Sequence, residues 1–394
     1  MKKTLNINAG TALLLNEQSD ALLGFDSINI NAGSVVASRK VYDKLVGMGA
    51  SINSGSMNII EVAGEIVELA GNSVITASMT FDGCFIICDG NLMIEDAKGL
   101  TGVTGIYANR IFHPDSVDLN AVKGITASRR IIYPEKAKLH LSGITLGDDA
   151  HIVLESTHHW VHGNVTALES SALEKLMLKG VSFQCRKLII RAGLYEKFSG
   201  MFKADSFVFV PDDHAFVDDI TLDAATSLLY GEKLFVCGDL MVPHDQASHL
   251  SGFSSLIVKG KATMPISAAK DFRACGRADE YDMYEGILLT VNGEETLDHE
   301  QLQTAIAMGI VYTLRVNGEF AFLDDVTAED IDAIASIQCN GEIFAPGRAR
   351  GPLVGKLKSI NGEILDISEY TNSNNGTGEE TEGESCINAG TYRL

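Results

Sequence analysis

The chain has 394 residues, of which 45% are hydrophobic, and it contains 38 Gly but only 7 Pro and 1 Trp. This composition excludes a disordered or collagen-like chain and is typical of many short strands joined by tight turns. The 31 Lys and Arg residues are outnumbered by 52 Asp and Glu, so the formal net charge is −21. Such a charge disfavours direct binding to nucleic acid or to an anionic membrane, and the expected partners are proteins or further copies of this chain.

The cysteines and the apolar segments indicate a cytoplasmic protein. No Cys-x-x-Cys pair exists, and the seven cysteines are widely spaced, which predicts reduced thiols and neither a disulfide framework nor a zinc site. The N-terminus lacks the apolar core of a signal peptide, and no window of eighteen apolar residues predicts a membrane span. No nucleotide, hydrolase or metalloprotease motif is present, so we expect no cofactor and no metal.

Internal repeats dominate the N-terminal part of the chain. Ile7–Gly10 reads INAG, Ile30–Gly33 repeats it, and Ile52–Gly55 reads INSG, with steps of 23 and 22 residues. Ile75–Ser78 follows 23 residues later and is expected to occupy the same place in the next repeat. A fixed period of this length is the signature of a repeat architecture.

Two further signatures continue the series. In the middle of the chain, Gly105–Asn109, Gly124–Ser128 and Gly143–Gly147 follow one another in steps of 19 residues. In the C-terminal part, an apolar residue followed by Asn-Gly-Glu recurs in steps of 25, 23 and 21 residues. Its four copies are Val291–Glu294, Val316–Glu319, Cys339–Glu342 and Ile360–Glu363.

These periods predict a mainly β protein, a parallel β-solenoid of about sixteen coils with a coil length of 19–25 residues. Alternating runs give strands with one buried face, and Asn-Gly permits the positive φ of a tight corner. Asn residues stacked at one corner are expected to form an amide ladder. Helical spacing in residues 38–48 and 297–308, and a capped start at residues 327–330, predict some β/α coils at both ends.

The predicted organisation has five parts. Three are groups of coils, at residues 1–100, 101–230 and 231–368. They are followed by a flexible acidic linker at residues 369–385, which has almost no large apolar side chain, and by a detached strand at residues 386–394.

The detached strand repeats the N-terminal signature. Ile387, Asn388, Ala389, Gly390 and Thr391 copy residues 7–11 one for one, which predicts that this strand docks on a solenoid edge by strand addition. Sixteen coils stacked about 4.8 Å apart make a rod of roughly 75–80 Å, whereas fifteen linker residues span at most about 50 Å. The strand is therefore expected to cap its own C-terminal end, or to bind the N-terminal end of another copy in a head-to-tail contact.

Two clusters are candidates for chemistry. Asp212, Asp213, Asp218 and Asp219 form an acidic patch, and stacked carboxylates can bind calcium or hydrolyse glycosidic bonds, although Asp is also the ordinary residue of turns. The segment His158–His162 places two histidines on one face of a strand. A metal site normally needs three or four ligands, so packing or surface histidines are favoured.

The phrase apolar-x-Gly-acidic-apolar at Val236–Leu240, Val316–Phe320 and Cys339–Ile343 resembles the bactofilins, bacterial β-solenoid proteins that assemble into filaments. The resemblance covers mainly residues 230–366, and it implies end-to-end polymerisation and a scaffold role without a nucleotide site. We therefore expect a non-enzymatic scaffold. The alternatives are a carbohydrate-active β-helix enzyme that uses the acidic patch, and an acidic nucleic-acid mimic that binds a basic partner.

Overall fold

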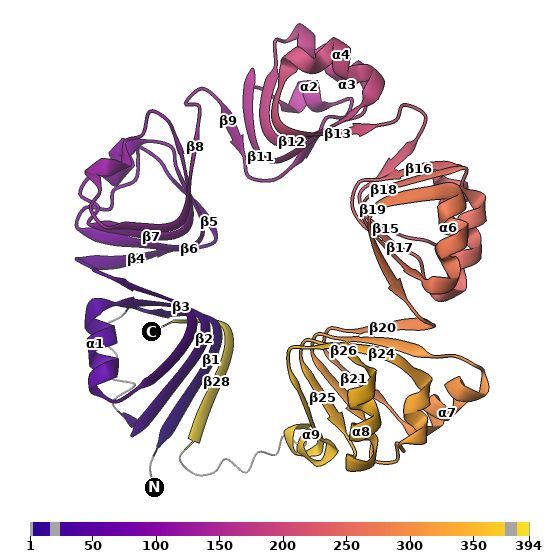
Figure 1. Ribbon diagram of the computed structural model, residues 1–394. Coiled ribbons are helices and arrows are strands. Elements are labelled where there is room, and N and C mark those ends of the chain that lie inside the picture. The colour runs from indigo at the N-terminus through magenta and orange to yellow at the C-terminus, as the bar shows by residue number, and fades with distance from the viewer. Residues whose placement is uncertain (1–2, 16–23, 375–383, 394) are drawn as a thin grey trace. The chain divides into compact units, whose positions relative to one another are not determined.

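The computed structural model describes residues 3–15, 24–374 and 384–393 (Figure 1). With 48% strand and 25% helix, and with parallel strand pairing, it confirms the mainly β class expected from the repeats. The chain divides into two units, residues 1–188, 200–206 and 378–394 in the first and residues 189–199 and 207–377 in the second. The boundary between them falls within two strands, β12 (Ser182–Arg191) and β13 (Phe202–Val210).

The described strands form six sheets, so a single continuous stack of coils is not what the structure describes. A repeat signature predicts that a segment folds as a coil. It does not say whether that coil bonds to the one before it, because the same alternation and the same corner occur on both sides of a break.

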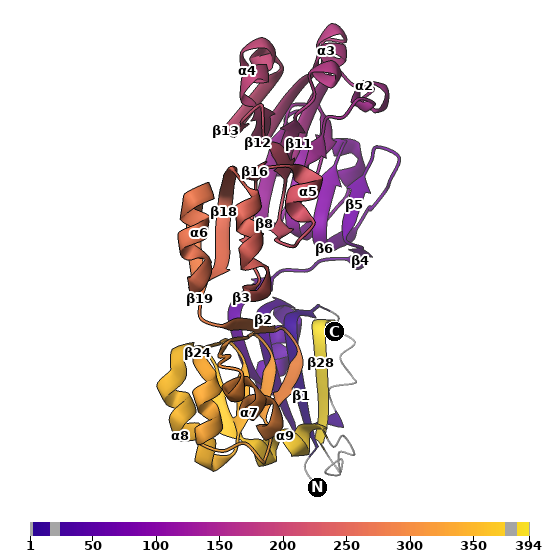
Figure 2. The same ribbon diagram turned by 90° about the vertical axis from the view of Figure 1, so that its right-hand side faces the viewer.

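The first sheet has the strand order β28-β1-β2-β3 (Figures 1 and 2). Its strands are β1 (Thr4–Leu14), β2 (Ser27–Ser38), β3 (Ser51–Ile60) and β28 (Glu384–Arg393). Ile7 pairs with Ile30, which pairs with Ile52, as the INAG period predicts. Helix α1 (Arg39–Gly47) begins at Ser38, whose hydroxyl accepts a hydrogen bond from the Val41 amide, and it confirms the helix expected there.

The second sheet contains β4 (Glu65–Leu69), β5 (Asn72–Ile75), β6 (Cys84–Ile94), β7 (Gly105–Pro114) and β8 (Ile125–Tyr133). Ile106 pairs with Ile125, in agreement with the 19-residue period. Ile75 pairs with Ile94 in this sheet, so the expectation that it continues the column of Ile7, Ile30 and Ile52 is wrong. Residues 61–64 contain no strand and end at Gly64 with a positive φ of 87°, which interrupts the stacking between β3 and β4.

The third sheet contains β9 (Lys138–His140), β10 (Ile144–Thr145), β11 (His158–Ala167), β12 and β13. Ile144 pairs with Val165 and not with Ile125, so the middle repeats also fall into separate sheets. Three helices accompany these strands, namely α2 (Ala150–Val153), α3 (Ser170–Leu178) and α4 (Ala192–Phe198).

The fourth sheet contains β14 (Ala215–Val217), β15 (Ile220–Thr221), β16 (Lys233–Val236), β17 (Leu240–Met241), β18 (Ser255–Pro265) and β19 (Gly276–Tyr284). Its helices are α5 (Thr226–Tyr230) and α6 (Ala269–Cys275), and α6 packs against β18 and β19. Helical coils therefore occur at both ends of the chain, as expected, and also in its middle, which was expected to be more purely β. In α3, for example, Leu173 and Leu176 are fully buried, so a short segment of mixed polarity folds as a helix because its apolar face is covered by the tertiary structure.

The Asn-Gly-Glu repeats form the last two sheets. One contains β20 (Ile287–Val291), β22 (Tyr312–Val316), β24 (Ile334–Cys339) and β26 (Leu357–Ile360), and the other contains β21 (Glu294–Leu297), β23 (Glu319–Phe322), β25 (Glu342–Ala345) and β27 (Glu363–Asp366). The column Val291–Val316–Cys339–Ile360 pairs as the sequence period predicts. The helices are α7 (His299–Ala307), α8 (Gly347–Lys356) and α9 (Ile367–Asn374), and a 3-10 turn, η7 (Glu329–Ala333), stands where a capped helix start was expected.

The corner glycines have a different role from the one expected. Positive φ is found at Gly124 (74°) and Gly180 (69°), but not at the glycines of the Asn-Gly-Glu corners. At Gly341 a Cβ atom would clash with the carbonyl oxygen of Gly318 in the coil below. The corners at Gly318, Gly341 and Gly362 therefore require Gly because each approaches the preceding coil too closely for a side chain.

Candidate functional site

The first sheet is completed by the C-terminal strand. In β28, Ile387 pairs with Ile7, Asn388 with Asn8, Ala389 with Ala9 and Thr391 with Thr11, in parallel orientation. Ile387 and Tyr392 are partly buried and pack against the apolar core of this sheet. Burial raises the pKa of the Tyr392 hydroxyl, as expected for a ring that leaves water.

This pairing corrects the expectation that the strand cannot reach its own first coil. That expectation assumed one straight rod, whereas the described coils belong to six sheets. Residues 369–374, expected in the linker, lie in α9, and residues 384 and 385 lie in β28. The rest of the expected linker, residues 375–383, is outside the described residues.

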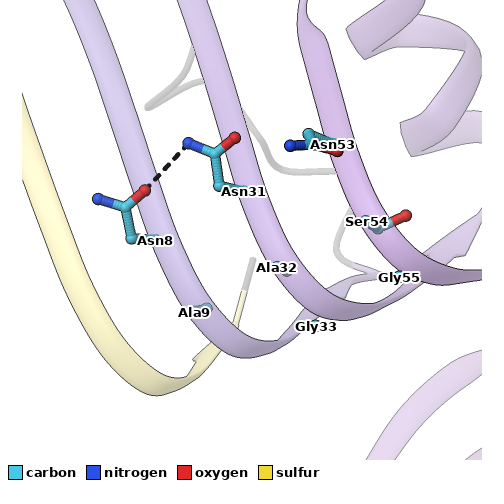
Figure 3. Close-up of a pocket in the computed structure, with 8 residues that line it drawn as sticks. All are labelled: Asn8, Ala9, Asn31, Ala32, Gly33, Asn53, Ser54 and Gly55. Atoms are coloured by element: carbon cyan, nitrogen blue, oxygen red, sulfur yellow. Dashed lines mark hydrogen bonds between the residues drawn. The ribbon is translucent and has the colours of Figure 1, made fainter. Parts of the chain in front are cut away.

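A polar groove, the amide groove, crosses β1, β2 and β3 of the same sheet (Figure 3). It has a volume of about 590 Å³. It is lined by Asn8, Ala9, Asn31, Ala32, Gly33, Asn53, Ser54 and Gly55. The small residues follow the asparagines along each strand, where the strand bends. These lining residues, all within the described ranges, include no titratable side chain, so the chemistry of the groove is limited to hydrogen bonding and contact.

Hydrogen bonds between coils confirm the expected amide ladder. The Asn31 amide donates to Asn8 Oδ1 at 3.0 Å, and the Asn29 amide donates to Asn6 Oδ1 at 2.8 Å. Amides also pair between Asn317 and Asn292 (3.0 Å) and between Asn361 and Asn340 (2.7 Å) in the Asn-Gly-Glu coils. A second polar cavity, of about 300 Å³, lies on those coils.

Three of the four carboxylates of the predicted acidic patch accept hydrogen bonds within the coils, those of Asp212, Asp213 and Asp219. Asp212 Oδ1 accepts the Gly193 amide at 3.0 Å, and Asp219 Oδ1 accepts the Asp239 amide at 2.6 Å. The Asp218 carbonyl accepts the Gly238 amide at 2.7 Å. Asp212 and Asp219 thus act as turn residues that satisfy backbone amides of neighbouring coils.

Asp213 belongs to a hydrogen-bonded chain that the sequence did not reveal. Its Oδ1 lies 2.8 Å from His214 Nδ1, and His214 Nε2 lies 2.9 Å from Ser255 Oγ. Its other oxygen accepts a hydrogen bond from Lys233 at 2.6 Å. The bond from Lys233, followed by that from His214, lowers the pKa of Asp213 to about 2. Ser255 is 41 residues from His214 in the sequence. Only the pairing of β14 with β16 and of β16 with β18 brings them together, so no local motif could have revealed these hydrogen bonds.

The histidines of residues 158–162 divide between the core and the surface. His159 is 2% exposed and stacks on Phe183, with ring centroids 5.3 Å apart, whereas His158 is exposed. His162 stacks on Trp160 at 5.7 Å, on the opposite face of β11. In the described part of the chain, no group of three or more His, Cys, Asp or Glu side chains is placed to hold a metal ion.

His159 has a defined tautomer. One of its ring nitrogens, Nε2, lies 2.8 Å from the Ser156 carbonyl oxygen, so this nitrogen donates its hydrogen. Neutral Nδ1 is then the acceptor for His140 Nε2, which lies 2.9 Å away. Burial lowers the pKa of both imidazoles, which keeps both rings uncharged at neutral pH.

Neither the helices of the described residues nor the comparisons with known proteins assign a function to these sites. Among the described residues, no helix is both long and apolar enough to cross a bilayer. Comparison with protein-family models, with curated proteins and with solved structures gave no match for this chain, so none of them bears on the resemblance to bactofilins. Fold and site together define a mainly β repeat protein whose last strand completes its first sheet.

Proposed function

We propose that this protein is a non-enzymatic scaffold of β-solenoid coils that assembles through its C-terminal strand. Strand β28 is a donor strand for the free edge of β1, within one chain and, by exchange, between two copies. Exchange places β28 of one copy on β1 of the next, which is a heterologous contact that propagates head to tail. The expected partner is therefore a second copy of this chain.

The observation that supports the proposal is the register of β28 on β1. Strands add to an edge through main-chain hydrogen bonds, and side chains at alternate positions decide which strand is accepted. Here Ile387 meets Ile7 and Ala389 meets Ala9, so the donor reproduces the Ile and Ala that β2 presents on the other side of β1. Opposite Thr11 the donor has Thr391 and β2 has Ser34, which are both hydroxyl residues. An unpaired β1 edge would otherwise be open to any strand.

The thiols favour a reducing compartment, which agrees with the expected cytoplasmic location. Cys88, Cys185 and Cys339 are buried, and burial raises the pKa of all three thiols, that of Cys185 to about 11. Protonated, buried thiols are poor nucleophiles and remain reduced.

A cysteine trap tests the donor-strand assignment. Asn6 lies opposite Cys386 in the β1–β28 register. Neighbouring strands are about 4.8 Å apart, which a disulfide can bridge. The full chain carrying Asn6→Cys is expected to form a disulfide with Cys386 under mild oxidation. The matched control is Asn58→Cys, at an exposed position of β3 that is not opposite Cys386.

Exchange is measured with two chains. A chain carrying Asn6→Cys and Cys386→Ser, mixed with the unmodified chain, forms a disulfide-linked pair only if β28 of one copy reaches β1 of the other. Light scattering of the full chain should show concentration-dependent oligomers that are absent from a chain ending at Gly383. If the Asn6→Cys chain forms an internal disulfide while mixed chains never cross-link and never oligomerise, β28 acts only within its own chain and the self-assembly proposal fails.

A further inference from the structure

A cavity separate from the two described above lies in the first unit. It is found where the N-terminal ends of β11, β12 and β13 meet the connection between β8 and β9. Its volume is about 300 Å³. This is at the lower end of the range for small-molecule sites. The cavity shares no residue with the β28 edge, so a ligand bound in it does not depend on the proposed function.

The floor of the cavity is a column of aromatic rings. His159 stacks on Phe183, with centroids 5.3 Å apart and the planes 21° from parallel. Phe183 stacks in turn on Phe202 at 5.6 Å and 19°. Phe183 is 2% exposed and Met201 is 6% exposed, so both are already packed in the protein alone, and half-buried Phe202 is the ring of the column that a ligand can reach. A flat apolar group can extend such a column without reorganising it.

The rim of the cavity is polar and positively charged. Lys136 and Lys203 line it and are exposed, and His158 Nδ1 lies 2.7 Å from Ser182 Oγ beside them. Gln184 adds an amide, and no Asp or Glu of the described ranges lines the cavity. In the part of the chain that the structure describes, neither lysine forms an ion pair.

The charge of this cavity is opposite to that of the protein as a whole. The chain carries a net charge of −21, yet two lysines line this cavity, and the described lining residues include no carboxylate. His159 cannot supply an additional charge, because its two ring nitrogens are occupied by Ser156 and His140 and burial keeps it neutral. Recognition of a ligand's charge therefore depends on Lys136 and Lys203.

We propose that this cavity binds a small aromatic anion, with the ring against Phe202 at the end of the aromatic column and the carboxylate or phosphate between Lys136 and Lys203. The ring uses the apolar floor, and the hydroxyl of Ser182 and the amide of Gln184 orient the acid group. A cation or a neutral polar ligand would leave the two lysines without a counter-charge. The anion is charge-paired at the rim, where water still screens the contact, so binding is weak and depends on salt.

Phenyl phosphate and benzoate are the probes, added to the full chain and followed by saturation-transfer NMR. A ligand of this size in a partly open site is expected to bind with a Kd on the order of 1 mM. Phenol lacks the charge and inorganic phosphate lacks the ring, so each is added as a competitor and should displace phenyl phosphate with an affinity at least about tenfold lower. Comparison of the two probes shows whether the site prefers a phosphate or a carboxylate.

Matched variants test whether the probe binds in this cavity or elsewhere on the protein surface. Replacing both lysines, Lys136→Gln with Lys203→Gln, should weaken phenyl phosphate binding at least about tenfold. Lys123→Gln, at an exposed lysine of the same unit that does not line the cavity, should leave it unchanged. Both lysines are exposed, so the double variant is expected to fold, which circular dichroism verifies. Binding that survives the double variant, equal binding of inorganic phosphate and phenyl phosphate, or no saturation transfer at about ten times the expected Kd overturns the proposal.

Discussion

Ile387 lies opposite Ile7, so the last described strand continues an isoleucine column that runs on through Ile30 and Ile52. Ile7 and Ile30 are fully buried, and Ile387 is partly buried against the same core. The contacts that hold β28 are therefore of the same kind as those between consecutive coils. An outermost strand is also the part of a sheet that opens at the lowest free energy, which makes β28 the natural place for exchange.

Replacing Ile387 with Asp should release β28 from β1. A carboxylate at this position removes a partly buried apolar contact and places a charge against Ile7, at a cost of about 2 kcal/mol in docking free energy. Amides of β1 that bond to β28 should then exchange with solvent at least about tenfold faster in hydrogen–deuterium exchange mass spectrometry. Ile132→Asp, at a position in β8 that is 60% exposed, is the control and should not change exchange in β1. Unchanged exchange in residues 4–14 of the Ile387→Asp chain would mean that β28 does not protect this edge.

Much of the local structure could be predicted from the sequence. The INAG column, the Asn-Gly-Glu column and helices α1 and α7 follow from period, corner residues and capping, because these depend on interactions between neighbouring residues or neighbouring repeats. The breaks between sheets could not be predicted. Ile75 stands 23 residues after Ile52, one repeat period on, yet it pairs with Ile94, since the choice of neighbour is made by the packing of whole sheets.

The candidate sites were predictable to a lesser degree. The strand at residues 387–391 was visible because it copies residues 7–11. Ser255, Lys136 and Lys203 carry no local signal, since each reaches its site only when distant coils pair. The acidic patch illustrates the reverse case, because a conspicuous cluster in the sequence supplies ordinary backbone acceptors in the fold.

Gly341→Ala should destabilise the Asn-Gly-Glu coils, whereas Gly293→Ala should not. The new Cβ at residue 341 would clash with the Gly318 carbonyl of the preceding coil, while residue 293 starts the stack and faces open space. Overpacking of this kind costs about 2 kcal/mol, and the control is expected within about 0.5 kcal/mol of the natural chain. Urea unfolding monitored by circular dichroism measures both. Equal effects of the two substitutions would show that the corner tolerates a side chain.

The amide ladder should contribute unequally along its length. Asn29 is half-buried and donates to Asn6 at 2.8 Å, whereas Asn31 is exposed and donates to Asn8 at 3.0 Å. We expect Asn29→Ala to lower the free energy of unfolding by about 1 kcal/mol and Asn31→Ala by at most about 0.5 kcal/mol. Asn29→Asp should be worse than Asn29→Ala, because its carboxylate would face the Asn6 oxygen with no donor between them. Thermal unfolding of the three variants ranks them, and an unchanged melting temperature for Asn29→Asp would contradict the ladder.

The contact between Asp330 and His299 predicts a pH dependence. Asp330 is fully buried, and its carboxylate accepts hydrogen bonds from His299 at 2.7 Å, Gln303 at 2.6 Å and both the amide and the hydroxyl of Thr327. Burial alone would raise its pKa, but these bonds outweigh burial and lower the pKa to about 2. The hydrogen bond to Asp330 raises the pKa of His299. Asp330 therefore stabilises the fold above a pH of about 4, and this contribution is lost as the pH falls towards 2.

His299 contributes with the opposite sign. Its stabilisation is complete below a pH of about 6.5, the ordinary pKa of an imidazole, and is lost as the pH rises through the raised value. An NMR titration should place the pKa of His299 above its ordinary value in the natural chain and lower it in Asp330→Asn, because the largest cause of the raised pKa is then removed. The urea midpoint of the natural chain should be higher than that of His299→Gln at pH 5 and equal to it at pH 9. The buried histidines His140 and His159 are present in both chains, so their contributions to the pH dependence cancel. Because Asp330 joins α7 to η7, Asp330→Ala should cost about 3 kcal/mol. A pKa for His299 that does not respond to Asp330→Asn would show that the two side chains are not paired.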